Sequence, residues 1–392
     1  MAAHVRLLVG TRKGLFVYTS DERRQRWEQS APLLAGWQGY HLSADLRCDP
    51  PRIYAAANNP WWGRSVAKSD DWGQTWEQRC EGLGFPEDMG LAIHAVWYVT
   101  PGLASEPGVV YAGTQPAGLF RSEDWGVSWA PVEGITRHEF RPFFQGIGES
   151  PGASSPLHSI EIDPRDARRI YVAVSGGGSY VTADGGATWE LFSHRALRSP
   201  ARAELFVSQN LAEVPPGTDP AAAWDMHKMV LDPKQPDRIW TQAHQGVFRS
   251  DDGGRTWHDV TPEPLSVVTV ALPTPSLPAF HGFPVAVTKR EPDAAFIVPL
   301  QADELRVCPG QFMVYRTRDG GASWEALTNG LPGPGDYQSV YREGMDTDGL
   351  EPEGVYAGTS NGQLYASADG GDHWQRLPGT LPPILSATCV VC

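Results

Sequence analysis

The stretch Thr182-Ala-Asp-Gly-Gly-Ala-Thr-Trp189 decides the fold of this chain, because its pattern recurs five more times. The shared pattern is Ser/Thr-x-Asp-x-Gly-x-Ser/Thr-Trp, with His in place of the second hydroxyl residue in the last copy. A hydroxyl and a carboxylate in this arrangement can form hydrogen bonds within a tight turn. The glycine takes a backbone angle that other residues resist, and the tryptophan covers the turn with a large apolar ring. The other copies run from Ser69 to Trp76, Ser122 to Trp129, Ser250 to Trp257, Thr317 to Trp324 and Ser367 to Trp374.

Short apolar runs precede each copy of the motif. They are five or six residues long and are separated by turn residues, as within the stretches 157–164 and 169–175. Such runs, with almost no helical periodicity, indicate an all-β fold. A seventh unit without the motif opens the chain, with Trp27 at the place of the motif tryptophan. Four short strands in each unit of roughly 50 residues are typical of a propeller blade.

The two ends of the chain predict how the ring closes. The first unit begins at its second strand and lacks an innermost one. The last unit is followed by a further apolar run, residues 384–391. We predict that this run completes the first blade, because closure removes exposed sheet edges. The prediction is therefore an all-β, seven-bladed propeller that forms a single domain over residues 1–392.

Composition excludes several classes of function. A net charge of −14 and an isoelectric point near 5.2 argue against a nucleic-acid partner, because phosphate binding needs a basic surface. No apolar run approaches the roughly 18 residues needed to cross a membrane. The beginning of the chain lacks the layout of a secretory signal, and the five cysteines show no disulfide framework. We therefore expect ordinary thiols and a cytoplasmic location.

The six copies of the motif resemble the BNR or Asp-box repeats of the sialidase-like superfamily, and we call them boxes below. The opening Gly10-Thr-Arg-Lys-Gly-Leu-Phe16 looks like that of bacterial proteins described as glycosyl hydrolases or exo-sialidases. The superfamily includes sialidases, xyloglucanase-type glycoside hydrolases, sortilin-like receptors and photosystem II assembly factors. The resemblance implies that the boxes lie on outer turns, away from the catalytic face, so that they identify the fold rather than the function.

Loop lengths indicate where the function lies. The distance from the Asp of an Asp-Pro pair to the next box tryptophan is nearly constant, as from Asp163 to Trp189. The connection from a tryptophan to the next innermost strand varies from 14 residues before His41 to 38 residues before His227. These variable loops surround the mouth of the central channel, and rigid scaffolds present binding residues on such loops. We therefore expect the site at the channel mouth.

Histidines gather near the predicted starts of the innermost strands. His158 and His227 share one register, each five residues before an Asp-Pro pair. Three neutral imidazoles converging on a cavity suit a divalent transition metal such as iron, copper or zinc. The alternative is that each histidine is a separate polar residue of the wall. The candidate metal ligands are His158, His227, His244, His41 and His94.

A glycosidase needs two carboxyl groups instead. Five carboxyl residues could face the mouth, namely Glu149, Asp225, Glu304, Asp336 and Glu343, and we take Glu149 and Asp225 as the catalytic candidates. Arginines could bind an acidic substrate, as the resemblance to sialidases implies, and tryptophans could stack on sugar rings. The candidate substrate-binding residues are Arg12, Arg141, Arg342, Trp61, Trp62 and Trp224.

Three hypotheses about function remain open from the sequence. The first is a hydrolase that acts on a small or glycosidic substrate at the channel mouth. The second is an enzyme that depends on a histidine-bound transition metal. The third is a scaffold without catalytic activity that binds a protein partner.

Overall fold

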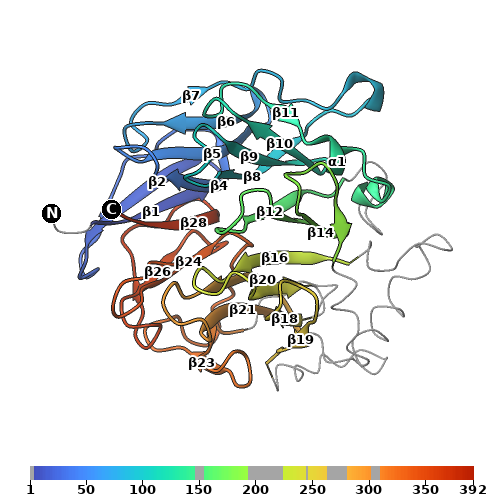
Figure 1. Ribbon diagram of the computed structural model, residues 1–392. Coiled ribbons are helices and arrows are strands. Elements are labelled where there is room, and N and C mark those ends of the chain that lie inside the picture. Colours follow the sequence, from blue (N-terminus) through green and yellow to red (C-terminus); the bar gives the residue numbers. More distant parts are fainter. Residues whose placement is uncertain (1–3, 146–153, 193–223, 244–245, 263–279, 302–309) are drawn as a thin grey trace, which may run out of the picture.

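The computed structural model describes residues 4–145, 154–192, 224–243, 246–262, 280–301 and 310–392. Within these residues, the strands form seven antiparallel sheets of four strands each (Figure 1). The innermost strands of successive sheets contact one another around a central axis. The predicted all-β, seven-bladed propeller is therefore confirmed.

Each blade ends in a short outer strand of two or three residues. The first four blades are, from inside to outside, β28 (Ile384–Val391), β1 (His4–Thr11), β2 (Gly14–Asp21) and β3 (Glu28–Gln29); β4 (Gln38–Asp45), β5 (Arg52–Asn59), β6 (Gly63–Ser69) and β7 (Glu77–Gln78); β8 (Ala95–Pro101), β9 (Val110–Gln115), β10 (Gly118–Ser122) and β11 (Ala130–Pro131); and β12 (Leu157–Ile162), β13 (Ile170–Val174), β14 (Gly178–Thr182) and β15 (Glu190–Leu191).

The remaining blades follow the same order. They are β16 (Met226–Leu231), β17 (Ile239–Ala243), β18 (Gly246–Ser250) and β19 (His258–Asp259); β20 (Phe280–Val287), β21 (Ala295–Gln301), β22 (Val314–Thr317) and β23 (Glu325–Leu327); and β24 (Met345–Thr347), β25 (Val355–Gly358), β26 (Leu364–Ser367) and β27 (Gln375–Arg376). Short helical turns occur in the connections, at η1 (Glu87–Met89), α1 (Glu133–Thr136) and η2 (Arg141–Gln145). No helix in the described part of the chain is long and apolar enough to span a membrane.

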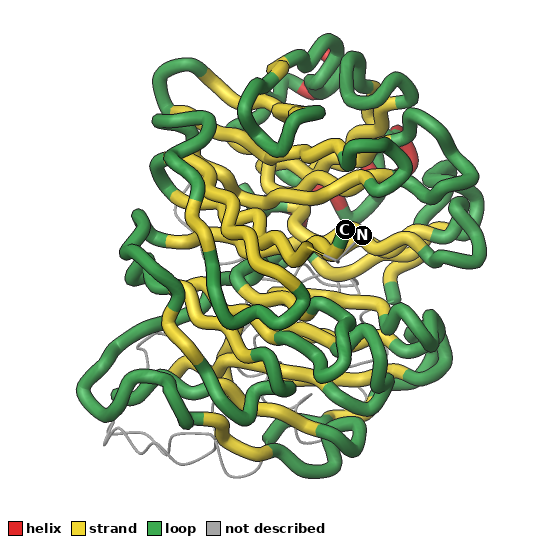
Figure 2. The backbone as a smooth tube through the Cα atoms, turned by 90° about the vertical axis from the view of Figure 1, so that its left-hand side faces the viewer, coloured by secondary structure: helices red, strands yellow, loops and turns green. Residues whose placement is uncertain are grey.

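The C-terminal strand closes the ring as predicted. Strand β28 pairs with β1, so that Val5 lies opposite Val391 and Val9 lies opposite Ala387. The two ends of the described chain consequently lie side by side (Figure 2). This pairing gives the first blade the inner strand that the N-terminal segment lacks.

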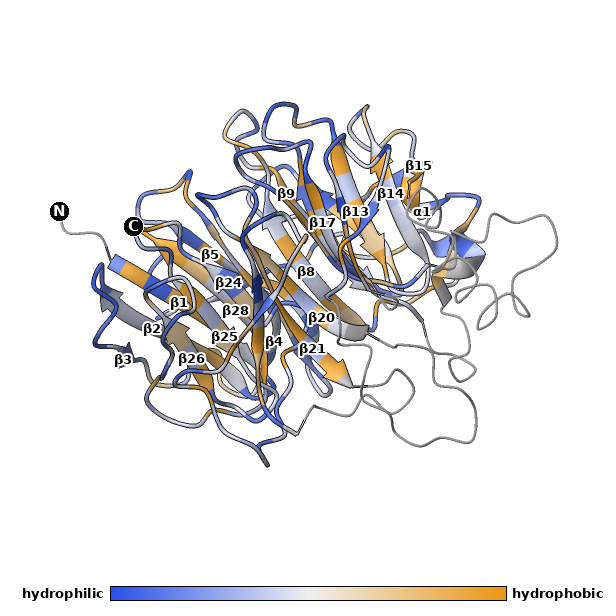
Figure 3. Ribbon diagram, turned by 90° about the horizontal axis from the view of Figure 1, so that it is seen from below, coloured by the Kyte–Doolittle hydropathy of each residue, from blue (hydrophilic) through white to orange (hydrophobic). Residues whose placement is uncertain are grey.

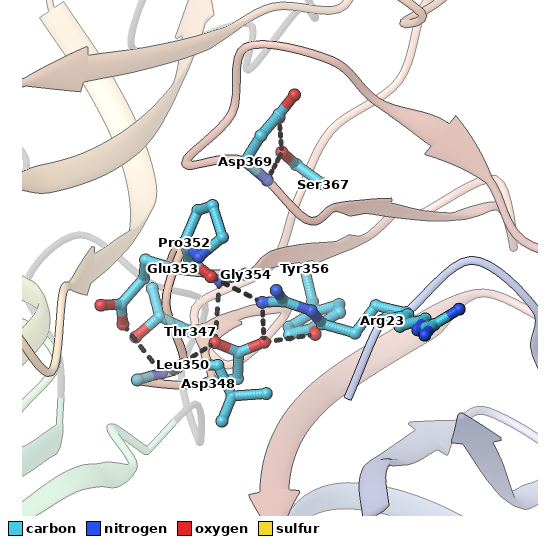
Figure 4. Close-up of polar contacts among 12 residues, drawn as sticks. Arg23, Thr347, Asp348, Leu350, Pro352, Glu353, Gly354, Tyr356, Ser367 and Asp369 are labelled. Carbon is cyan, nitrogen blue, oxygen red and sulfur yellow. Dashed lines mark hydrogen bonds and ion pairs between the residues drawn. The ribbon is translucent and has the colours of Figure 1, made fainter. Parts of the chain in front are cut away.

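A buried ion pair joins the first and last blades. The Arg24 guanidinium donates to Asp348 Oδ2 at 2.9 Å. The Tyr356 hydroxyl donates to the same oxygen at 2.7 Å (Figure 4). The backbone N–H groups of Leu350 and Gly354 occupy the other carboxylate oxygen, each at 2.8 Å. The charge of Asp348 is thus compensated, as a buried carboxylate requires.

Apolar side chains fill the spaces between neighbouring blades. Seen from below, the sheets carry most of the hydrophobic residues and the turns most of the hydrophilic ones (Figure 3). One cluster joins the third and fourth blades through Tyr111, Leu157 and Trp189. The box turn of the fourth blade is held locally, because Thr182 Oγ1 donates to Asp184 and accepts from the N–H of Gly186. The hydrogen bonds that the sequence predicted for the box therefore form within the turn itself.

Candidate functional site at the channel mouth

Bulges occur in the inner strands at the channel mouth. In six of the seven described sheets, the pairing of the innermost strand slips near its mouth end. A residue left unpaired by such a slip breaks the regular alternation of side chains between the two faces of the strand. The residues left out of the pairing are Tyr40, His41, Trp97, His158, His227, Phe283, Pro284 and Leu385.

A pocket of about 360 Å³ lies at this mouth. Five of the unpaired residues line it, and the segment before β24 contributes Tyr341, Arg342 and Glu343. The rings of Tyr40 and Trp97 meet edge to face, with centroids 5.0 Å apart. Arg12, a predicted binding residue, also lines the pocket, and its charge lies close enough to affect the ionisation of Tyr40. The lining residues include Tyr40, Trp97, His158, Phe283 and Leu385.

Polar side chains beside the pocket form a connected network. Asp225 accepts hydrogen bonds from Ser175 Oγ and from the N–H of Gly176, both at 2.9 Å. Its second oxygen lies 3.3 Å from His227 Nε2, and His227 Nδ1 lies 2.6 Å from the carbonyl oxygen of Gly282. Arg342 donates to Ser175 Oγ at 3.2 Å. The network thus connects Asp225, predicted as a catalytic residue, to an arginine of the pocket wall.

The Arg342 guanidinium is also held by aromatic rings. Its central carbon lies 4.8 Å from the ring centroid of Phe283 and 6.0 Å from that of Trp97. Cation–π contacts of this kind fix a guanidinium more strongly when it is partly desolvated. Arg342, a predicted binding residue, therefore presents a positive charge at a defined place in the wall of the mouth pocket.

Glu343 lies at the boundary between the mouth pocket and a second cavity of about 540 Å³ in the channel. Lys228 forms an ion pair with Glu343 Oε2, and His41 Nε2 lies 3.9 Å from the same oxygen. Glu343 Oε1 is buried and has no hydrogen-bond partner among the described residues. Burial raises the pKa of Glu343, although Lys228 counteracts this effect.

The charges around Glu343 form a layer across the channel. Four blades contribute His41, Tyr98, Glu161 and Lys228, all of which line the second cavity. His41 stacks on Tyr98 with centroids 3.9 Å apart, and burial lowers the pKa of His41 to about 3. Burial raises the pKa of Glu161 to about 7, against the opposing effect of Lys228. One lysine thus serves two buried carboxyl groups, which favours retention of a proton near neutral pH.

The described histidines do not form the predicted metal centre. No three His, Cys, Asp or Glu side chains are grouped to hold a metal ion within the described ranges. His41 instead contacts the Val99 carbonyl oxygen at 3.0 Å, and His227 faces Asp225 and Gly282. His94 is exposed at the surface. His244 lies outside the described residues, so its predicted role is not tested.

His158 occupies the same position in its blade as His227, as predicted, but it has different contacts. Its Nδ1 lies 3.1 Å from Ser159 Oγ, and its Nε2 is buried without a partner among the described residues. Burial, together with the charge of Arg342, holds the pKa of His158 well below its ordinary value. His158 is therefore a neutral polar group in the wall of the mouth pocket.

The other predicted site residues have separate positions. Arg141 donates to the carbonyl oxygen of Ala117 at 2.9 Å, and burial lowers its pKa to about 10. The prediction that Trp224 forms a surface for ligands is wrong, because this residue is fully buried against Phe248. Its position directly before an inner strand suggested the mouth, but its ring points into the core. Trp61 and Trp62 are exposed, and Glu149 lies outside the described residues.

Sequence reasoning missed several residues of the mouth. Trp97, Phe283 and Tyr341 line the pocket, and Lys228 and Glu161 form the charged layer. A signal was present for Lys228, since a lysine is unusual in a buried strand, and the run from Met226 to Leu231 is apolar apart from Lys228 and His227. No comparable signal marked Trp97, whose direction depends on the bulge in β8.

Comparisons with known proteins agree with the fold. The BNR/Asp-box repeat family matches residues 248–259. A xyloglucanase of Acetivibrio thermocellus is 26% identical over 327 residues, which cover 77% of this chain and 35% of that protein. An oligoxyloglucan-reducing end-specific xyloglucanase of Emericella nidulans is 25% identical over 229 residues, covering 56% and 25%. The matches thus span about a quarter to a third of the length of these curated relatives.

Solved structures show the same architecture. The GH74 enzyme of Niastella koreensis superposes with a TM-score of 0.61 at 16% identity, covering 95% of this chain and 51% of that one. YCF48 from Cyanidioschyzon merolae superposes with a TM-score of 0.50 at 15% identity, covering 88% and 87%. At these identities the likeness shows the fold alone. The chain therefore carries a BNR/Asp-box repeat in a seven-bladed propeller and is similar to xyloglucanases, while the specific likeness to sialidases stays a prediction.

Proposed function

We propose that this protein is a glycoside hydrolase that binds a sugar in the mouth pocket. The observation that carries the proposal is Glu343, a buried carboxyl group with an unpartnered oxygen at the wall of an aromatic-lined pocket. Burial, and to a smaller extent Asp346, raise the pKa of Glu343 against the opposing effects of Lys228 and Arg342, and a raised pKa suits a general acid. The similarity to xyloglucanases supports a carbohydrate as the substrate class.

Asp225 is the proposed partner of Glu343. Ser175 Oγ and the N–H of Gly176 donate to Oδ1 of Asp225, and His227 Nε2 lies 3.3 Å from Oδ2, so that each carboxylate oxygen has a polar neighbour. A carboxylate held in this way suits a general base or a nucleophile, and glycoside hydrolysis divides the two roles between two carboxyl groups. Lys228 acts as a positioning residue, because it holds Oε2 of Glu343, while Oε1 has no hydrogen-bond partner among the described residues.

The test is a panel of chromogenic β-glycosides and xyloglucan oligosaccharides. We expect turnover by the wild-type protein and a loss of about 100-fold or more in kcat for Glu343→Gln and for Asp225→Asn. Glu28→Gln, a change on the exposed outer strand β3, is the matched control and should keep the wild-type rate. Absence of turnover across the panel, or equal rates in wild type and both site variants, would refute the proposal.

A further inference from the structure

His227 and Asp225 face each other in a contact that is attractive only when it holds a proton. His227 Nδ1 lies 2.6 Å from the carbonyl oxygen of Gly282, and a carbonyl oxygen can only accept a hydrogen bond. The hydrogen of a neutral imidazole must therefore sit on Nδ1. Nε2 is then a bare acceptor, and it lies 3.3 Å from Oδ2 of Asp225, which is also an acceptor when the carboxyl group is ionised. A proton between the two atoms removes this conflict.

The contacts around the pair place that proton on the imidazole. Oδ1 of Asp225 accepts hydrogen bonds from Ser175 Oγ and from the N–H of Gly176, both at 2.9 Å. Hydrogen bonds donated to a carboxylate favour its ionised form. Gly282 accepts from Nδ1 of His227, and such an acceptor favours the protonated ring. Both sets of contacts therefore favour an imidazolium beside a carboxylate, which is the charge-assisted form of the hydrogen bond.

Burial suits an ion pair better than a single charge at this place. The side chain of His227 is 1% exposed, and that of Asp225 is 26% exposed. An isolated charge is costly in such a closed site, whereas two opposite charges 3.3 Å apart compensate each other. Two other titratable or charged groups lie beside the pair in the described part of the chain. Arg342 opposes a further positive charge, and His158 is neutral and responds to the charges of both His227 and Asp225.

A closed ring of contacts holds the pair beside the mouth pocket. The His227 ring packs against Phe283 with centroids 4.7 Å apart, and the Arg342 guanidinium lies 4.8 Å from the centroid of Phe283. Arg342 donates to Ser175 Oγ, and Ser175 Oγ donates to Asp225, which completes the ring at His227. Phe283 and Arg342 both line the pocket. The pair is therefore fixed directly behind two residues of the pocket wall.

We propose that His227 is a positioning residue for Asp225: it carries a proton at neutral pH, and the resulting imidazolium holds Asp225 in its ionised form beside the mouth pocket. This inference rests on the proposed function, in which Asp225 is the general base or nucleophile. The proton stays on Nε2 of His227 during turnover. Its loss at high pH leaves two acceptors facing each other, so that Asp225 is no longer held in position.

Nuclear magnetic resonance of the imidazole nitrogens tests the protonation of His227. At pH 7.5 an ordinary histidine, with a pKa of about 6.5, is neutral. We expect His227 to have both ring nitrogens protonated at this pH in the wild type. In Asp225→Asn we expect a neutral ring, because an amide N–H can donate to the bare Nε2. The exposed His258 on β19 is the control in the same spectrum and should be neutral. A neutral His227 in the wild type at pH 7.5 would overturn the inference.

Turnover of an activated aryl glycoside tests the positioning role. Its leaving group departs without a proton, so its hydrolysis does not depend on the general acid Glu343. His227→Asn keeps a donor for Gly282 but leaves Oδ2 of Asp225 without a donor. Its kcat should fall about 10- to 100-fold, the value of one hydrogen bond to a charged group. His227→Gln, whose amide can donate to Oδ2, should recover part of this loss.

The pH profile of the same reaction distinguishes a titrating imidazolium from a merely structural side chain. The wild-type kcat should fall as the pH rises, because His227 loses its proton. The kcat of His227→Gln should not fall in this way, since an amide does not titrate. His258→Gln, the same change on an exposed outer strand, is the matched control and should keep the wild-type rate and profile.

The outcomes separate this inference from the proposed function. Wild-type kcat in both His227 variants, or the same pH profile in wild type and His227→Gln, would refute the positioning role and leave the hydrolase intact. An imidazolium at His227 in a protein that hydrolyses no glycoside would refute the hydrolase and support the assignment of the proton. The wild-type and Asp225→Asn spectra require no change at His227, so the test remains decisive even if its variants do not fold.

Discussion

Replacing Glu161 by glutamine tests the charged layer beneath the mouth pocket. The pKa of Glu161 is raised from 4.5 to about 7, first by burial and then by the neighbouring Glu343. Between these two pH values the folded protein keeps a proton that the unfolded chain releases, so the free energy of unfolding falls as the pH rises. Glutamine cannot ionise. Its side-chain oxygen can still accept the hydrogen bond that the N–H of Leu231 donates to Glu161 at 3.2 Å.

The magnitude follows from the width of that pH window. The gap between 4.5 and about 7 corresponds to roughly 3 kcal/mol at most, since one pH unit is worth about 1.36 kcal/mol. Glu161 is partly open to the channel cavity, where water weakens the effect, so we expect about 1–3 kcal/mol. For a chain of this length, that difference shifts the melting temperature by about 1–4 °C.

Thermal unfolding followed by tryptophan fluorescence measures the effect. Glu161→Gln and the wild type should melt at the same temperature at pH 4, where both carry a neutral side chain. At pH 8 the variant should melt at the higher temperature. Glu28→Gln, on the exposed strand β3, should show no such dependence on pH. A difference of equal size at both pH values, or a variant that is less stable at pH 8, would refute the reasoning.

Two further substitutions test the positions of single residues. Trp224→Ala should lower the free energy of unfolding by about 3–5 kcal/mol in urea titrations, because it empties a fully buried site, whereas the exposed Trp62→Ala should change it by less than about 0.5 kcal/mol. Lys228→Met should reduce kcat more than it raises KM, and Lys228→Arg should restore part of the rate, because an arginine can still contact Oε2 of Glu343; equal kcat values in wild type and Lys228→Met would contradict the positioning role.

The ring could be predicted from the sequence because its signals are local. Each box turn is closed by side chains within a few residues, as when Thr188 donates both its N–H and its hydroxyl to Asp184. Such turns repeat wherever the motif repeats, so the six motifs mark six blades, and the first unit, which has Trp27 but no motif, adds the seventh. Closure by β28 was also predictable, since an unpaired apolar strand at each end of a repeat array leaves one arrangement without exposed edges.

The candidate site could not be predicted to the same degree, because bulges determine where its side chains point. A regular strand alternates its side chains between two faces, and alternation alone predicts the direction of a residue from its neighbours. The slip between Met226 and Lys228 removes His227 from this alternation and leaves Lys228 facing the channel. The slip between Leu157 and Ser159 does the same for His158. The two histidines therefore have the same position in their blades, although their contacts differ.

The charged layer could not be predicted for a second reason, which is that its residues lie far apart along the chain. Lys228 and Glu343 are separated by 115 residues, yet they form one buried ion pair. The sequence around either residue does not indicate the other as its partner, because each blade forms through its own turns. Only closure of the ring brings the fifth and seventh blades onto one axis, and the partner of Lys228 follows from that closure. The number of blades thus determines the site indirectly, because it decides which inner side chains meet across the channel.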